Sequence, residues 1–427
     1  MKKYEYPELG EVLYKEKLSN GLTVCVLPRP GFSKKLAYFV TDYGSIHTHF
    51  RLEGREIQAP AGIAHFLEHK MFDLPGGRDV SAELASLGAG TNAFTSYDMT
   101  AYYISCTERF EECLRLLIEF VSTPYFTEES VAKEMGIIDQ EIGMNIDAPE
   151  SRVFEDLMRA MYREHPIRVP ILGDSDTIRE ITPEILHDCH RAFYTPGNMI
   201  LCVIGDVNPD RVAEIATEIL GAEPRPVGEK IADWKETMDA SGENPVSSME
   251  VSMPTFQLGF KCEPTGKGDE AIRQEIVGDL AAEALFGESS ALYLRMYEDG
   301  IIDSSFGGGF ETIDGMAMLL CSGDSDEPEA IREAILEEAE RIAKEGVEED
   351  AFGRMKRSAL GRRLRDLDSF SSTCFRLCAY HFSDFDYFRF PGIYQKIESR
   401  EIQEFLGRVV RANRAALSVI EPAKEAE

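Results

Sequence analysis

The sequence predicts an α+β fold of two similar domains, each a mostly antiparallel sheet packed with helices and joined to the other by a linker. The main observation is an internal echo: residues 181–205 and 397–421 share their pattern of apolar positions, 397 − 181 = 216 residues apart, about half of the 427-residue chain. Ile181, for example, falls on Ile397. Each copy reads as an amphipathic helix followed by a buried strand, so one such unit is expected to close each half. Chance similarity of two helix–strand units is the alternative interpretation.

Apolar periodicity and helix-boundary residues indicate the elements of the first half. The predicted elements, in order, are strands 22–27 and 36–43, helices 62–72 and 80–87, a strand-like stretch 92–106, helices 108–121 and 128–145, a helix 182–195 and a buried strand 199–204. The first two strands are rich in β-branched and aromatic residues and are separated by prolines and a glycine, which is typical of a turn. Thr107, Thr127 and Thr182 precede helical segments, where a threonine hydroxyl can cap the first turn.

A change in composition suggests where the domains part. Residues 223–245 are rich in Pro, Gly, Glu and Lys and contain the only tryptophan, Trp234. This segment is expected to link an N-terminal catalytic domain, residues 1–222, to a C-terminal non-catalytic domain, residues 246–427.

The charge of the chain argues against several classes of partner. With 45 basic and 76 acidic side chains, the formal net charge is −31, which repels nucleic-acid phosphates and anionic lipids and favours cationic ligands. A hydrophobic content of 43% is that of a packed globular protein. No apolar run reaches the roughly 18 residues of a membrane helix, and the N-terminus lacks the apolar stretch of a signal peptide. We therefore expect a cytoplasmic protein with neither nucleic-acid nor membrane partners.

The number and spacing of the cysteines also indicate a cytoplasmic protein. There are nine, an odd number, and none forms a CxxC pair. This usage is typical of buried thiols in a reducing compartment rather than of a disulfide framework. Cys374 and Cys378 are one helical turn apart and are expected to pack in the core rather than to bind a metal.

Residues 65–69 have the pattern HxxEH on the predicted helix 62–72. At 100° per residue, His65, Glu68 and His69 share one helix face. Two histidines one turn apart can share a zinc ion, which lowers the pKa of a water molecule toward about 7, while the glutamate takes its proton and passes it to a leaving amine. A helix with two structural histidines and an incidental glutamate is the alternative interpretation.

A catalytic zinc ion takes a third protein ligand, and the helix 128–145 offers carboxylates for it. Glu134 and Glu141 are seven residues apart, so they lie about 20° apart around a helix and can face one site. Acidic residues on a helix of so acidic a protein usually form a solvated face. Spacing alone does not choose between Glu134, Asp139 and Glu141.

With these motifs the sequence resembles the pitrilysin and insulin-degrading-enzyme type of zinc metallopeptidases, including the mitochondrial processing peptidase β-subunit and short two-domain bacterial members. In that family an inverted HxxEH motif is followed about seventy residues later by a zinc-binding glutamate. The resemblance implies one zinc ion per chain, held by His65, His69 and Glu141. It also implies Glu68 as the general base and Glu134 as a second carboxylate of the catalytic site, which orients it.

The segment Gly88–Thr95 is similar to the family's strand beside the active site, which pairs with an extended peptide substrate. The resemblance implies that Asn92 contacts the substrate backbone and that Ala93 and Phe94 belong to the same substrate-binding strand. Considered without the resemblance, this segment is a turn followed by a strand.

The second half lacks the metal motif. The three motif residues fall on Asp279, Ala282 and Glu283, so no metal site is expected there. In the family this half holds the substrate with an arginine and, seven residues later, a tyrosine. Arg295 takes the place of the arginine, whereas Ile302 stands where the tyrosine is expected.

The resulting prediction is a zinc-dependent endopeptidase that cleaves peptides or unfolded segments. Two such domains make half of the chamber of longer family members, so the resemblance implies a homodimer or a heterodimer with a related subunit. The net charge of −31 suggests an acidic chamber that favours basic peptides. The rival hypotheses are a catalytically silent peptide-binding or assembly subunit, and a zinc hydrolase of small amides or esters.

Overall fold

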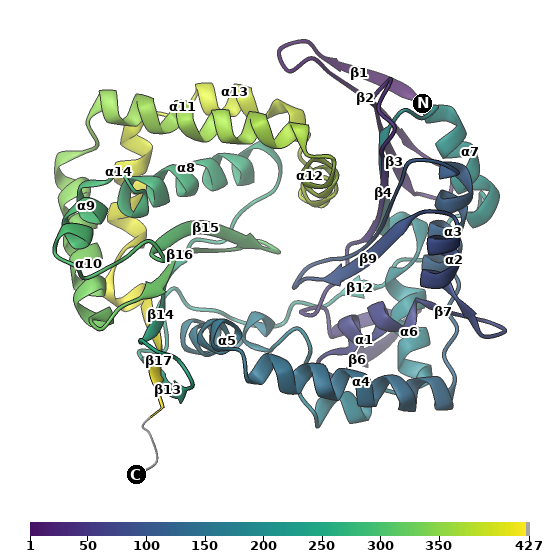
Figure 1. Ribbon diagram of the computed structural model, residues 1–427, viewed down its shortest axis with the longest axis horizontal. Helices are drawn as coiled ribbons and strands as arrows, with labels where there is room; N and C mark the ends of the chain where they lie inside the picture. Colours follow the sequence, from purple (N-terminus) through teal and green to yellow (C-terminus); the bar gives the residue numbers. More distant parts are fainter. Residues whose placement is uncertain (424–427) are drawn as a thin grey trace.

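Residues 1–423 are described by the computed structural model of the chain, in which two halves face each other across the centre of the molecule (Figure 1). Each half contains one main β-sheet covered by helices. The predicted α+β class with two similar, mostly antiparallel domains is confirmed. Within the described residues, no helix is long and apolar enough to cross a membrane.

The N-terminal sheet has seven strands in the order β1-β2-β3-β11-β4-β10-β9, and its one parallel pair is β3 with β11. The strands are β1 (Lys2–Tyr6), β2 (Glu11–Lys17), β3 (Thr23–Pro28), β4 (Lys35–Thr41), β9 (Gly90–Thr95), β10 (Thr100–Cys106) and β11 (Met199–Gly205). Side chains of β3 alternate between two core clusters: Val24 and Val26 lie on the outer face, and Cys25 and Leu27 on the inner face. The sheet therefore needs a covering layer on both sides.

Helices of the first half supply the outer layer, in which α3 and α7 pack side by side on the sheet. The first half contains the helices α1 (Ile63–Lys70), α2 (Val80–Ser86), α3 (Phe110–Ser122), α4 (Glu128–Ile146), α5 (Pro149–Met161), α6 (Pro183–Phe193) and α7 (Pro209–Leu220). Its short strands outside the main sheet are β5 (His49–Leu52), β6 (Arg55–Gln58), β7 (Asp73–Leu74) and β8 (Arg78–Asp79), and β12 (Glu229–Lys230) follows in the connecting segment. Thr127 and Thr182 cap α4 and α6 as predicted. Thr107 does not cap α3, because that helix starts two residues later, after Arg109.

The C-terminal sheet has five strands in the order β13-β17-β14-β16-β15, with one parallel pair, β13 and β17. The strands are β13 (Val246–Met249), β14 (Thr255–Cys262), β15 (Gly307–Ile313), β16 (Met316–Asp324) and β17 (Ala415–Pro422). Both the neighbours and the directions repeat those of β3-β11-β4-β10-β9 in the first half. The two halves are thus copies of one topology.

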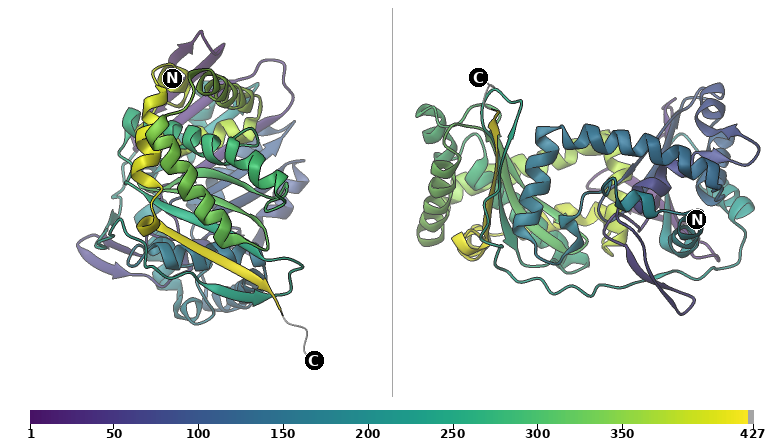
Figure 2. Two further views of the ribbon diagram at one scale, coloured as in Figure 1. Left: turned by 90° about the vertical axis from the view of Figure 1, so that its left-hand side faces the viewer. Right: turned by 90° about the horizontal axis from the view of Figure 1, so that it is seen from below.

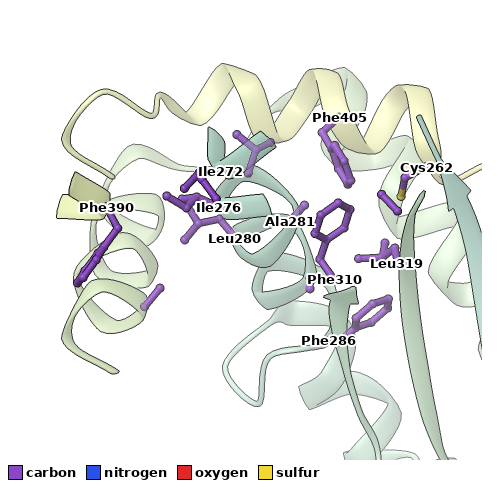
Figure 3. Close-up of a cluster of buried hydrophobic side chains, with 14 of the residues drawn as sticks. Cys262, Ile272, Ile276, Leu280, Ala281, Phe286, Phe310, Leu319, Phe390 and Phe405 are labelled. Atoms are coloured by element: carbon purple, nitrogen blue, oxygen red, sulfur yellow. The ribbon is translucent and has the colours of Figure 1, made fainter. Parts of the chain in front are cut away.

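Helices α8, α10 and α14 cover one face of the C-terminal sheet (Figure 2, left). The helices of this half are α8 (Gly268–Phe286), α9 (Ala291–Glu298), α10 (Pro328–Glu345), α11 (Glu349–Arg365), α12 (Phe370–Phe382), α13 (Phe390–Gln395) and α14 (Ser399–Val409). Figure 3 shows the core between them, where Phe310 of β15 lies next to Phe405 of α14 and beside Ala281 of α8.

The internal echo of the sequence corresponds to this repeat. Helices α6 and α14 begin at residues 183 and 399, and strands β11 and β17 at 199 and 415, so each pair is 216 residues apart. The strand-like stretch 92–106 is instead a hairpin of β9 and β10. The polar residues between them make the turn, in which the Ser96 N–H donates to the carbonyl of Met99 and the Ser96 hydroxyl to the Asp98 carboxylate.

The two halves exchange one helix each. Helix α5 packs on β14 and β17 of the C-terminal sheet, where Leu157 and Met161 share a core cluster with Met318. Helix α12 packs on β4 and β11 of the N-terminal sheet, and Ser371 at its start hydrogen-bonds the Tyr38 hydroxyl at 2.6 Å (Figure 1). The inner face of each sheet is therefore covered by the other half, which sequence periodicity did not predict. The domain boundaries at residues 222 and 246 stay a prediction.

The segment that joins the two sheets runs along the molecule and is tied to both halves (Figure 2, right). Its strand β12 pairs with β5, and the Trp234 ring packs edge-on against His165 with ring centroids 4.7 Å apart. Glu236 accepts three backbone N–H groups of residues 163–165 at 2.5–2.8 Å, and it also accepts the Lys261 ammonium at 2.7 Å. Burial alone would raise the pKa of Glu236, but these hydrogen bonds outweigh it and hold the pKa at about 2.

Glu236→Gln is expected to destabilise the fold by about 3 kcal/mol at pH 7, because it leaves the buried Lys261 ammonium without its charge partner. The folded-state pKa of Glu236 lies below that of an unfolded glutamate, about 4.3. Its contribution is therefore complete above that unfolded value and is lost as the pH falls toward 2. Urea unfolding of both proteins at pH 7 and pH 3 measures this, because pH 3 lies between the folded and unfolded pKa values. Glu229→Gln, an exposed change in the same segment, should alter stability by less than about 0.5 kcal/mol.

Candidate metal centre

The HxxEH motif lies on α1, a short helix that is buried on most sides. The helix begins after Gly62, whose φ of 86° is in the left-handed region. A Cβ at Gly62 would lie 2.3 Å from the carbonyl oxygen of Leu172, so only glycine fits this start. The helical advance of 100° per residue then places His65, Glu68 and His69 on one face, as predicted.

Helix α4 brings two glutamates to this face of α1. Glu141 lies between the imidazoles, with one carboxylate oxygen 3.6 Å from Nε2 of His65 and the other 3.6 Å from Nε2 of His69. Glu134, two turns earlier, has an oxygen 3.0 Å from Nδ1 of His69. Asp139, which spacing alone had left open, is an exposed residue of α4 outside this group.

The donor atoms of this group fit a zinc ion. One ligand atom from each of His65, His69 and Glu141 lies within 4.8 Å of the other two. The two distances of 3.6 Å are too long for hydrogen bonds. Two donors about 2.0–2.1 Å from a tetrahedral zinc ion are about 3.3 Å apart, so the spacing accommodates such an ion. Among residues 1–423, this is the one group of metal-binding side chains with such spacing.

The protonation states of the two histidines also suit the binding of a cation. His69 donates its Nδ1 hydrogen to Glu134, which leaves the Nε2 lone pair directed toward Glu141. Burial lowers the pKa of His65 to about 4, so that imidazole is neutral at pH 7 and can be a ligand. Burial also opposes a charge on His69, but the hydrogen bond to Glu134 and the neighbouring carboxylates outweigh it and raise its pKa. The group thus attracts positive charge, whether from a proton or a metal ion.

Glu68 lies beside the three donors and is held by a residue that sequence reasoning missed. The Thr95 hydroxyl on β9 donates to Glu68 Oε2 at 2.6 Å. Burial raises the pKa of Glu68, and the hydrogen bond from Thr95 partly opposes this. A carboxylate with a raised pKa can hold a proton during a reaction, as a general base must. Thr95 is the last residue of the segment Gly88–Thr95, but its spacing from Glu68 in the sequence gave no sign of this hydrogen bond.

Strand β9, next to Glu68, is the last strand of its sheet and pairs with β10 along one edge. Its other edge faces the interior of the molecule (Figure 1). Asn92 is exposed on this strand, and its side-chain oxygen accepts the N–H of Ala93 at 2.9 Å. Phe94 reaches across to Phe375 of α12, with ring centroids 6.0 Å apart. Within residues 1–423, the strand therefore presents unpaired backbone groups and an aromatic side chain close to the candidate metal ligands.

Arg295 is not brought to this group. It is an exposed residue of α9, which lies at the outer end of the other half, away from α1 (Figure 1). Ile302, where a tyrosine was expected, is buried in the core of that half. A substrate-binding role for Arg295 stays a prediction.

The corresponding place in the second half contains an ion pair. Arg362 is the fourteenth residue of α11, as Glu141 is of α4. Its guanidinium lies 2.9 Å from the carboxylate of Glu283, the residue that falls on His69. The permanently charged Arg362 thus takes the helix position in α11 that Glu141 has in α4. The sequence of the second half contains no pair of histidines.

Comparisons with known proteins identify the family of this chain. The family model for Insulinase (Peptidase family M16) matches residues 54–175, and the model for the Peptidase M16 inactive domain matches residues 180–359. The zinc protease YmfH of Bacillus subtilis (strain 168), itself uncharacterized, is 37% identical over 431 aligned positions that cover 99% of each chain. The chain belongs to the insulinase family.

Insulinase-family structures have the same fold. A crystal structure of an M16-like peptidase from Alicyclobacillus acidocaldarius matches with a TM-score of 0.93 and 31% identity, covering 98% of this chain and 100% of that one. A protease from Helicobacter pylori, with a TM-score of 0.83 and 19% identity over 96% of this chain and 99% of its own, shows the fold alone. The predicted resemblance is confirmed, and relatives named as zinc proteases support a function of the peptidase type for this insulinase-family chain.

Proposed function

We propose that this chain is a zinc-dependent endopeptidase that cleaves peptides or unfolded segments. The observation that carries the proposal is the meeting of two imidazole Nε2 atoms with the Glu141 carboxylate beside a buried Glu68. His65, His69 and Glu141 would hold one zinc ion. When bound, the ion supplies Lewis-acid chemistry, which polarises a peptide carbonyl and lowers the pKa of water.

The remaining steps belong to side chains of this protein. Glu68 takes the proton of the attacking water and delivers it to the leaving nitrogen, and its raised pKa lets it hold that proton in between. Thr95 fixes one oxygen of Glu68, so the carboxylate keeps a single orientation. Glu134 holds the His69 ring through Nδ1 and keeps its Nε2 free for the metal.

Substrate binding is proposed at the free edge of β9. An extended peptide can add to this edge as a further strand through main-chain hydrogen bonds, with Asn92 contacting its backbone and Ala93 and Phe94 along it. Such pairing requires an extended chain and does not require a peptide terminus. It therefore favours endopeptidase action on flexible segments over cleavage of folded domains or small amides.

The test combines metal content with cleavage. Elemental analysis of the purified protein should find about one zinc ion per chain, and the protein should cut an unstructured peptide of about twenty residues at an internal bond. A chelator should stop cleavage, and added zinc should restore it. Zinc without cleavage would favour the silent peptide-binding or assembly subunit, and turnover of small amides or esters alone would favour the small-molecule hydrolase. Absence of zinc after reconstitution would overturn the proposal.

Basic peptides are the proposed preferred substrates, because the net charge is −31 and Glu68, Glu134 and Glu141 surround the reaction centre. Raising the salt from about 0.05 M to about 0.5 M should lower kcat/KM several-fold for a basic peptide, since screening weakens its attraction. The same change should alter cleavage of a neutral peptide of equal length by less than about twofold. Equal salt effects on the two peptides would sink this part of the proposal.

Assembly, location and domain limits complete the proposal. The chain would work as a homodimer or as a heterodimer with a related subunit, because two domains provide half of the chamber expected for the family. Its nine buried cysteines are unpaired, which supports a reducing, cytoplasmic location. The catalytic domain would comprise residues 1–222, and the non-catalytic domain residues 246–427.

A further inference from the structure

Four cysteine side chains meet where α12 crosses the N-terminal sheet. Cys25 on β3 and Cys202 on β11 are direct neighbours in the parallel ladder, so their side chains lie on the same face of the sheet. Cys374 and Cys378 lie one turn apart on α12, which covers that face. All four belong to one core cluster. The cluster thus contains two thiols from each half of the chain.

Cys202 faces both thiols of α12, and its contact with Cys374 has the geometry of a hydrogen bond. Sγ of Cys202 lies 3.6 Å from Sγ of Cys374, and both side chains are fully buried. A disulfide requires an S–S distance of about 2.05 Å, so the sulfur atoms need to approach each other by about 1.5 Å. Rotation about the Cα–Cβ bonds of the two residues would have to supply this movement. The pair has no part in the metal centre, which lies on α1 and α4.

A cavity beside α12 brings small molecules close to the cysteine cluster. A cavity of about 350 Å³ between the β1–β2 hairpin and α12 is lined by Cys25 and Leu377 and also by the exposed Asp384. Cys25 is 2% exposed at its wall, and Cys202 is the neighbour of Cys25 in the ladder. A small neutral oxidant can therefore come close to the thiols from this cavity, whereas a bulky thiol reagent cannot reach Cys202 directly.

We propose that Cys202 and Cys374 form a disulfide when the protein meets a hydroperoxide, and that this bond fastens the two halves together. The sulfur of one thiol attacks the O–O bond and becomes a sulfenic acid, while the released oxygen leaves as water or, from an organic peroxide, as an alcohol. The second sulfur then attacks the first, the S–O bond breaks, and water leaves as the S–S bond forms. Two thiols lose two electrons, and the hydroperoxide gains them.

The bond would join a central strand of one half to a helix of the other and close a loop of 374 − 202 = 172 residues. Cross-links that close long loops restrict the unfolded chain the most. Oxidation should therefore raise the thermal midpoint by about 4 °C in a chain of this size. It should do so without any change in zinc content.

Peptide mapping tests the proposal. The protein is treated with hydrogen peroxide, its remaining thiols are alkylated in denaturant, and trypsin is added without reductant. Trypsin cuts at Arg376, so Cys374 and Cys378 fall into different peptides, residues 366–376 and 377–389, while Cys202 lies in residues 192–211. The expected product joins 192–211 to 366–376 and disappears on reduction. The proposal is overturned by nine alkylated cysteines, by oxidised acids without a cross-link, or by a bond to 377–389 or to the Cys25 peptide.

Two variants distinguish the effect of the Cys202–Cys374 disulfide from general oxidative damage. Cys374→Ser should lose both the cross-linked peptide and the rise in thermal midpoint, while Cys378→Ser, one turn away on the same helix face, should keep both. Each variant is compared with itself, peroxide-treated against reduced, so a change in its basal stability does not affect the result. A rise in thermal midpoint that survives in Cys374→Ser would contradict the assignment.

Discussion

Glu68→Gln is expected to retain zinc and to lose peptide cleavage by about a thousandfold or more, because an amide cannot take the proton of the attacking water. Its side-chain oxygen can still accept the Thr95 hydroxyl, so the local structure should stay intact. The two measurements are kcat/KM on an unstructured peptide and zinc content by elemental analysis. Together they distinguish loss of the base from loss of the metal.

Glu129→Gln is the matched control for this change, since Glu129 is an exposed glutamate in the first turn of α4. It should leave both cleavage and zinc unchanged. Cleavage by Glu68→Gln within tenfold of the parent would refute the proposed mechanism. Cleavage that disappears together with zinc would show instead that Glu68 supports the metal.

Glu141→Gln is expected to lower zinc affinity by roughly a hundredfold or more and to abolish cleavage at ordinary zinc concentrations. The reason is that it removes a charged ligand, a larger change than loss of an outer hydrogen bond, which typically lowers metal affinity 10- to 100-fold. Equilibrium dialysis against a zinc buffer measures the affinity. His65→Ala should have the same outcome, because that imidazole faces Glu141 at 3.6 Å.

The control here is Asp139→Asn on the same helix. Asp139 is two residues from Glu141 but exposed, and it lies outside the cluster of ligands. Zinc affinity and cleavage should both be unchanged in this variant. If Asp139→Asn lost zinc while Glu141→Gln kept it, the assignment of the third ligand would be wrong.

The helices that carry the candidate site could be predicted from the sequence because their signals are local. Spacing within α1 fixes which face bears His65, Glu68 and His69, and the separation of seven residues does the same for Glu134 and Glu141 on α4. The choice of Glu141 over Asp139 as a ligand came from family resemblance, and it remains a prediction even though the structure brings Glu141 between the imidazoles. Spacing on one helix cannot show which residues of another helix face it.

Contacts between distant segments were not predictable in the same way. The bond from Thr95 to Glu68 depends on how β9 lies against α1, and no periodicity encodes that packing. The exchange of α5 and α12 also left no signal, because an amphipathic helix shows that it has a buried face but not which sheet covers it. The hairpin of β9 and β10 was missed because its turn lacks glycine and proline.

Helix α5 of the first half covers the C-terminal sheet, and helix α12 of the second half covers the N-terminal sheet. Neither half can therefore complete its core alone. During synthesis the inner face of the N-terminal sheet stays open to water until α12, which ends at residue 382, has left the ribosome, so folding depends on contacts remote in sequence. The same interlock opposes a hinge-like opening of the two halves, since opening would expose the inner faces of both sheets at once. A peptide that adds to the edge of β9, as proposed above, would therefore enter a frame whose two halves support each other.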